Sequence, residues 1–321
     1  QNTYSYKTKE DLSTTLHYAA RGPNIETIKF LTKQNIVSAG ERDINGQTAL
    51  HIAATFGRDV TVKFLVAEMG NAINQVDNAG RTPLHLASHN GHKKTVVTLL
   101  SLGAKTTMED NKYVLPMLYA VKNNHLDVVK IFLGANLHSI DKKGSTALHY
   151  SVRNGHEVIS EALLRKKAKI NCKNYRNRTP MYEAAAKTCN EKSIKLLLKY
   201  GADVNEKWEV GVTALHIASS VGNSSVVEAL LQGKADVDAQ DTYGITALHL
   251  AASKNHKGAV EILLKYGANI NKLDFIGASV LCHAARKNHI DLLTILIAKG
   301  ADVNVGRGLP LQLWKNSCRS D

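Results

Sequence analysis

Residues Asp241–Leu273 read DTYGITALHLAASKNHKGAVEILLKYGANINKL and form one complete unit of this 321-residue chain. Asp241 and Gly244 predict a turn, because aspartate can accept hydrogen bonds from the backbone that follows it and glycine tolerates a positive φ. Thr246 predicts the N-cap of a short helix. A second segment with helical spacing of apolar residues then ends at Gly267. The unit is therefore a turn, a helix, a loop and a second helix.

The same unit recurs along nearly the whole chain at intervals of 30 to 34 residues. One unit is too small to bury its own apolar face, so each unit has to stack on its neighbours. The residue that opens the Thr-x-Leu-His box is, in successive units, Thr15, Thr48, Thr82, Leu115, Thr146, Thr179, Thr213, Thr246 and Ser279, and a ragged tenth match starts at Leu309.

The box and the interval are similar to those of a known repeat. The box GRTPLHLA at residues 80–87, the segment GADVN at residues 201–205 and 300–304, and a period near 33 closely resemble the ankyrin repeat. The resemblance implies an all-α solenoid of paired antiparallel helices that are joined by β-hairpin-like turns.

The repeats also predict the domain organisation. We expect a leader over residues 1–9 and nine repeats over residues 10–303. Residues 304–321 are interpreted as a partial capping repeat or as the start of a following F-box-like domain. The repeats are expected to begin near residues 10, 43, 77, 110, 141, 174, 208, 241 and 274.

The fourth repeat departs from the pattern. Tyr113 stands in place of the turn glycine, Leu115 in place of the box threonine and Leu118 in place of the box histidine. Its second helix is two residues shorter than in the other repeats, because Gly134 follows early. We therefore expect altered stacking between residues 110 and 141.

The amino-acid composition indicates which kind of partner and which cellular compartment to expect. The chain has 41 lysines and arginines against 28 acidic residues, a formal charge of +13, which favours acidic partners. Its four cysteines show no metal-ligand spacing, and this favours a reducing, cytoplasmic or nuclear location. A secreted or membrane-tethered location stays open if the chain is a fragment. No apolar stretch has the length of about 18 residues that a spanning helix needs.

The sequence gives no positive reason to expect an enzyme. We find no phosphate-binding glycine loop, no nucleophile elbow and no metal-ligand constellation, and we therefore expect no catalytic residue, cofactor or metal site. The recurring box histidines are interpreted as structural hydrogen-bonding groups, since catalysis needs one constellation rather than spaced copies. They are His17, His51, His85, His149, His216 and His249.

Basic residues gather at the positions that the scaffold leaves free. The resemblance implies that the turn tips and the ends of the first helices form a concave face, which commonly binds partners in ankyrin proteins. At these positions we count twelve basic residues and one acid, whereas the ratio of 41 to 28 would place about five acids among thirteen charges. The turns supply Arg81, Lys112, Lys142, Lys143, Arg176 and Arg178, and the helix ends supply Lys122, Arg153, Lys187, Lys254, Arg286 and Lys287.

Aromatic residues follow on four successive turns. Tyr175, Trp208, Tyr243 and Phe275 occur in the sixth to ninth repeats, with Ile276 beside the last. Turn tips are normally polar, so exposed rings there indicate a contact surface. The alternative is that these rings pack on adjacent turns.

These patterns favour a protein-interaction scaffold or adaptor that binds an acidic protein segment. Nucleic-acid or nucleotide binding on the same face is a second hypothesis, with bases stacked on the rings and phosphates held by arginine. A third is that the chain is the regulatory arm of a larger enzyme, channel, toxin or ubiquitin-ligase adaptor. The residues we expect to bind a partner are Arg81, Lys112, Lys122, Lys142, Lys143, Arg153, Tyr175, Arg176, Arg178, Trp208, Tyr243, Phe275 and Ile276.

Overall fold

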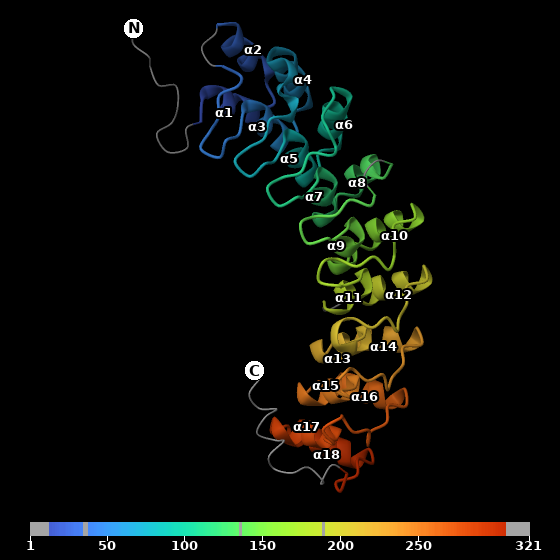
Figure 1. The fold of residues 1–321 in the computed structure, drawn as a ribbon. Helices are drawn as coiled ribbons and strands as arrows, with labels where there is room; N and C mark the ends of the chain where they lie inside the picture. Colours follow the sequence, from blue (N-terminus) through green and yellow to red (C-terminus); the bar gives the residue numbers. More distant parts are fainter. Residues whose placement is uncertain (1–12, 35–37, 135–136, 188–189, 306–321) are drawn as a thin grey trace. The chain divides into compact units, whose positions relative to one another are not determined.

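The chain is a succession of short helix pairs (Figure 1). The computed structural model describes residues 13–34, 38–134, 137–187 and 190–305. Within these ranges it has no strand, and one isolated antiparallel bridge joins Ile140 to Thr146. The predicted all-α class is confirmed. The predicted leader, the tenth match at Leu309 and the F-box-like segment lie outside the described residues, apart from 304–305.

The repeats contribute two helices each, and within each body helices of the same repeat pack together, as α5 does with α6, and matching helices of neighbouring repeats stack, as α13 does with α15. The first helices are α1 (Thr15–Arg21), α3 (Ala49–Thr55), α5 (Pro83–His89), α7 (Pro116–Lys122), α9 (Ala147–Arg153), α11 (Pro180–Ala185), α13 (Ala214–Val221), α15 (Ala247–Ser253) and α17 (Val280–Arg286). The second helices are α2 (Ile25–Lys33), α4 (Asp59–Met69), α6 (Lys93–Ser101), α8 (Leu126–Phe132), α10 (Glu157–Arg165), α12 (Glu191–Lys199), α14 (Ser224–Gln232), α16 (Lys257–Lys265) and α18 (Ile290–Ala298). Two 3-10 turns, η1 (Gly70–Asn74) and η2 (Glu209–Gly211), complete the set.

The described residues divide into two compact bodies. The N-terminal body holds the residues up to 151 together with 158–168, and the C-terminal body holds 152–157 and the residues from 169 onward. The division therefore runs through the fifth repeat. The fourth repeat, where we expected altered stacking, lies within the N-terminal body, and there α7 packs on α5 and α8 packs on α6. As expected, α8 is short, with seven residues.

A box threonine and histidine start six of the nine described first helices, and His17, His51, His85 and His216 also join their helix to the next repeat. In the second repeat, the Thr48 N–H donates to His51 Nδ1 over 3.2 Å, and His51 Nε2 donates to the Arg81 carbonyl over 3.1 Å. Both ring nitrogens are thus used, Nδ1 as an acceptor and Nε2 as a donor, and this requires the neutral Nε2–H tautomer. The same bridges run from His17 to Gln47, His85 to Val114 and His216 to Ile245 over 2.9 to 3.0 Å. The predicted structural hydrogen-bonding role is confirmed for these four histidines, whereas His249 accepts from the Thr246 N–H but has no partner at Nε2.

In the first repeat, the structure corrects the residue at which the Thr-x-Leu-His box begins. The N-cap of α1 is Thr14, whose N–H donates to His17 Nδ1 over 3.1 Å. The box therefore opens at Thr14 and not at Thr15. The error arose because two threonines are adjacent, and only the three-residue distance to the histidine separates them.

A side-chain oxygen closes the turn that precedes each first helix. In seven of the described turns, the Oδ1 atom of the first residue accepts two backbone N–H groups at 2.8 to 3.1 Å. The fourth residue has a positive φ, and at Gly46 a Cβ atom would lie 2.9 Å from the backbone nitrogen of Asn78. Tyr113 takes this fourth position with a φ of 56°. A left-handed conformation is unfavourable for tyrosine, so this turn carries local strain.

The box histidines should make stability depend on pH. Burial lowers the pKa of His51 to about 4, and its hydrogen bond to the Arg81 carbonyl offsets only part of the effect. Burial and the neighbouring His283 lower the pKa of His249 to about 4. As the pH falls, the unfolded chain takes up these protons first. The stabilisation is therefore complete above about pH 6.5 and is lost progressively toward pH 4. Urea unfolding between pH 7 and pH 4.5 should show this decline.

A variant of His51 and a direct titration test whether the buried histidines cause this dependence of stability on pH. His51→Leu should lower the free energy of unfolding at pH 7 by about 2 kcal/mol, since it leaves buried backbone groups unpaired. It should also weaken the dependence on pH. An NMR titration in which the His51 ring of the folded protein takes up its proton near pH 6.5 would contradict the account.

Tyr113→Gly should stabilise the fourth repeat. Glycine tolerates the positive φ, and Tyr113 is 57% exposed, so little packing is lost. After allowance for the greater freedom of glycine in the unfolded chain, we expect a gain of about 1 kcal/mol in the free energy of unfolding. Tyr175→Gly is the matched control, because Tyr175 is an exposed turn tyrosine without a positive φ, and it should destabilise. Equal losses in both variants would show that no strain is stored at Tyr113.

Candidate functional site

The turns present a regular set of side chains that the scaffold does not use. In most of the described turns, the first, fourth and sixth residues serve as side-chain acceptor, positive-φ residue and helix cap. The second and third residues are exposed in every described turn, whereas the fifth is partly exposed or buried. We call these exposed positions the turn surface, and it is described separately for each body.

The turn surface of the N-terminal body carries exposed lysines. Lys112 lies on the turn of the fourth repeat, and Lys142 and Lys143 lie together on the turn of the fifth. Arg81 on the third turn is different, because its guanidinium lies 2.7 Å from the buried carboxylate of Asp77. Lys112, Lys142 and Lys143 therefore offer their positive charge to a partner, whereas the charge of Arg81 is partly neutralised by Asp77.

Two helix-end cations are held by contacts within the protein. The Lys122 ammonium lies 4.2 Å from the centre of the Tyr150 ring. Burial lowers the pKa of Lys122, although the carboxylate of Asp141 opposes this effect. In the C-terminal body, Arg153 Nη1 lies 2.9 Å from the carboxylate of Glu183. Both residues thus support the fold and offer less charge to a partner than their positions in the sequence indicate.

The turn surface of the C-terminal body carries exposed rings. Tyr175 is 73% exposed, Tyr243 is 63% exposed and Phe275 is 69% exposed, and Ile276 beside them is 42% exposed. The turns that carry Tyr243 and Phe275 are joined directly, because the Phe275 N–H donates to the Tyr243 carbonyl over 2.9 Å. The two rings are therefore presented on a rigid, hydrogen-bonded pair of turns.

Trp208 does not belong to this exposed set, and the prediction that it lies open on a turn tip is wrong. Its side chain is only 6% exposed and packs edge-to-face on Tyr182, with ring centres 4.8 Å apart. The reason is its place in the turn. Trp208 occupies the first position, where the other described turns have aspartate or asparagine pointing inward. Tyr182 likewise replaces the box histidine, so an aromatic contact joins these two repeats instead of the histidine bridge.

The two arginines of the sixth turn lie beside this aromatic pair. Arg176 is exposed, and the Arg178 guanidinium lies over the Tyr182 ring, 4.6 Å from its centre. Together they border a hollow of about 190 Å³. Its walls are formed by Arg176, Arg178, Tyr182, Trp208, Glu209, Val210, Val212 and Ile217.

Further apolar residues of the turns are exposed. Ile44 is 54% exposed and Val210 is 49% exposed, and both belong to the turn surface. Tyr113, at the fourth position of its turn, is 57% exposed. Ile44 was not selected from the sequence, and a count of apolar as well as charged residues at the turn positions would have found it.

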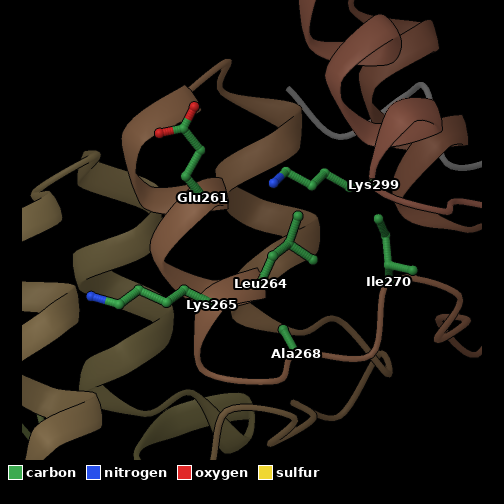
Figure 2. Close-up of a pocket in the computed structure, with 6 residues that line it drawn as sticks. All are labelled: Glu261, Leu264, Lys265, Ala268, Ile270 and Lys299. Atoms are coloured by element: carbon green, nitrogen blue, oxygen red, sulfur yellow. The ribbon is translucent and has the colours of Figure 1, made fainter.

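A second hollow, of about 280 Å³, lies on the second-helix side of the C-terminal body (Figure 2). Figure 2 shows Lys299 extending toward α16, which supplies Glu261 and Leu264 to the wall. Lys265 pairs with Glu228 over 3.1 Å. These side chains belong to ordinary stacking between repeats, and none of the residues selected from the sequence lines this hollow.

Two further classes of site were searched for in the described part of the chain. No group of three or more histidine, cysteine, aspartate or glutamate side chains is arranged there to hold a metal ion. No helix in those ranges is long and apolar enough to cross a membrane.

Comparison with known proteins supports the repeat assignment. A family model described as ankyrin repeats, in three copies, matches residues 8–110, 117–208 and 209–307. The crystal structure of the human ASB11 ankyrin repeat domain superimposes with a TM-score of 0.63 at 29% sequence identity, over 70% of this chain and 99% of that domain.

Two curated viral proteins are similar over part of their lengths. A putative ankyrin repeat protein of fowlpox virus, FPV031, is 35% identical over 131 residues, which are 39% of this chain and 38% of that protein. A putative ankyrin repeat protein of Acanthamoeba polyphaga mimivirus, L371, is 27% identical over 128 residues, 37% of this chain and 17% of that protein. The matched family model spans nearly all of the described residues, and the chain belongs to the ankyrin-repeat family.

Proposed function

We propose that this chain is a non-enzymatic scaffold or adaptor that binds an acidic, partly apolar protein segment on its turn surface. Ankyrin repeats are generally protein–protein interaction modules. The observation that carries the proposal is the exposure of Tyr175, Tyr243 and Phe275, at 63 to 73%, on turns that have no structural need for a ring. Aromatic side chains are the most common anchors of protein interfaces.

The lysines of the N-terminal body have a different role in this proposal. Lys112, Lys142 and Lys143 are exposed, and exposed charges are strongly screened by salt. They therefore contribute mainly to the rate at which an acidic partner is attracted and oriented. The rings, which bury apolar area on contact, contribute mainly to the lifetime of the complex.

Phe275→Ala should lower retention of bound proteins strongly in a pull-down from cell lysate, with proteins identified by mass spectrometry. Loss of one interface anchor typically costs about 2 kcal/mol, which is more than tenfold in affinity. Phe30→Ala is the matched control, since Phe30 is 59% exposed on the second helix α2 of the other body. It should retain the same proteins as the unaltered chain.

Two results of this experiment would contradict the proposal. Equal losses for Phe275→Ala and Phe30→Ala would show that the turn surface has no special role. Retention that disappears after nuclease treatment would show that the ligand is a nucleic acid, as in the second hypothesis.

The triple variant Lys112→Gln, Lys142→Gln, Lys143→Gln should slow association with a captured partner several-fold at low salt and change dissociation little. Stopped-flow or surface-plasmon measurements at two salt concentrations check this. The control with the same charge change is Lys63→Gln, Lys94→Gln, Lys130→Gln, which alters exposed lysines of the second helices. If both triple variants slow association equally, only the total charge matters and the turn lysines have no steering role.

A further inference from the structure

The hollow beside Trp208 combines three features that are unusual among the described turns. Trp208 replaces the aspartate or asparagine that closes the other turns through its side-chain oxygen. Its indole N–H is buried and has no hydrogen-bond partner. Val210, the third residue of the turn, has a φ of 53°, whereas the third residue of every other described turn lacks a positive φ. Each feature disfavours the free protein, and such departures cluster at functional sites.

The residues that line the hollow combine cationic and apolar side chains. Arg176 is exposed, and no described carboxylate forms an ion pair with it. Arg178 lies over the Tyr182 ring and 3.8 Å from Glu183, which also pairs with Arg153. Val210 and Val212 supply apolar surface to the same hollow. The lining thus offers a cation to an anionic group and apolar surface to an aliphatic side chain.

We propose that this hollow receives one acidic residue and an adjacent branched aliphatic residue from within the partner segment. The carboxylate pairs with Arg176, and the aliphatic side chain packs against Tyr182, Val210 and Val212. An interior position in the segment fits best, because the exposed Tyr175 and Tyr243 on neighbouring turns continue the surface on either side. This inference rests on the proposed function and names the chemistry that the partner has to supply.

Glu209 makes the inference more specific. It lies in the wall of the hollow and is exposed. A second acidic residue beside the first would meet this like charge, which disfavours a continuous acidic run at this point. The expected motif is therefore a single Asp or Glu followed or preceded by Leu, Ile or Val, rather than a polyacidic tail.

A displayed library of random 12-residue peptides tests the proposal with a defined probe. The peptides are fused through their C-termini, so every carboxylate comes from a side chain. Selection on the unaltered chain should enrich an acid next to a branched aliphatic residue. A synthetic selected peptide, acetylated and amidated, should bind Arg176→Gln about tenfold more weakly, because a charge-assisted hydrogen bond is lost. Arg165→Gln, which removes an exposed arginine from the second helix α10, should bind normally.

Tryptophan fluorescence provides a readout at the hollow itself. The chain has two tryptophans, so in a Trp314→Phe background all tryptophan emission comes from Trp208. Binding of the selected peptide should shift or quench this emission, since it changes the surroundings of a ring in the wall of the hollow.

Several results would overturn this inference. The inference fails if no peptide is selected, or if the selected peptides lack the acid and aliphatic pair. It also fails if Arg176→Gln and Arg165→Gln have equal effects, if only peptides with a free C-terminal carboxylate bind tightly, or if binding leaves the Trp208 emission unchanged. If the selected peptides still lose affinity for Tyr243→Ala and Phe275→Ala, the failure is confined to the hollow and the proposed function stands.

Discussion

The hydrogen bond from one box histidine to the backbone of the next repeat is the constraint on which the rest of the structure depends. A single repeat cannot bury its own apolar face, so it is stable only against a neighbour. The ring of His51 satisfies the Thr48 N–H inside its own repeat and the Arg81 carbonyl of the next. A second contact runs in the opposite direction, where His92 Nε2 donates to the Thr55 carbonyl over 2.9 Å. Helix capping and repeat stacking are therefore achieved by the same few side chains.

Because only a few residues of each turn are needed for the fold, the remaining turn residues are available to bind a partner. Three positions close most of the described turns and cap the helix that follows, and the exposed second and third residues are free to vary. The protein uses that freedom unequally, with lysines on the turns of the N-terminal body and rings on those of the C-terminal body. The junction of the sixth and seventh repeats goes further, because Tyr182 and Trp208 replace both the histidine and the aspartate of the usual bridge. An aromatic contact keeps the repeats together there and creates a hollow that the histidine bridge does not provide.

Most of the fold could be predicted, because turn, cap and box residues recur in register and each copy confirms the others. The candidate site was harder to predict, since it consists of the positions that do not recur. Exposure of Tyr175, Tyr243 and Phe275 followed from their positions in the turn. Trp208 was assigned to the surface although its first position points inward. Arg153 appeared free because its partner Glu183 lies 30 residues away, where no local pattern reveals it.

The central claim is that partners meet this protein on the turn residues that the scaffold leaves free. A photoreactive phenylalanine analogue placed at position 243 or at position 30, followed by irradiation in cells, tests it directly. Both positions hold exposed aromatic residues, one on a turn and one on a second helix. The account predicts discrete protein crosslinks from position 243 and few from position 30. Crosslinks mainly from position 30, or to nucleic acid from position 243, would contradict it.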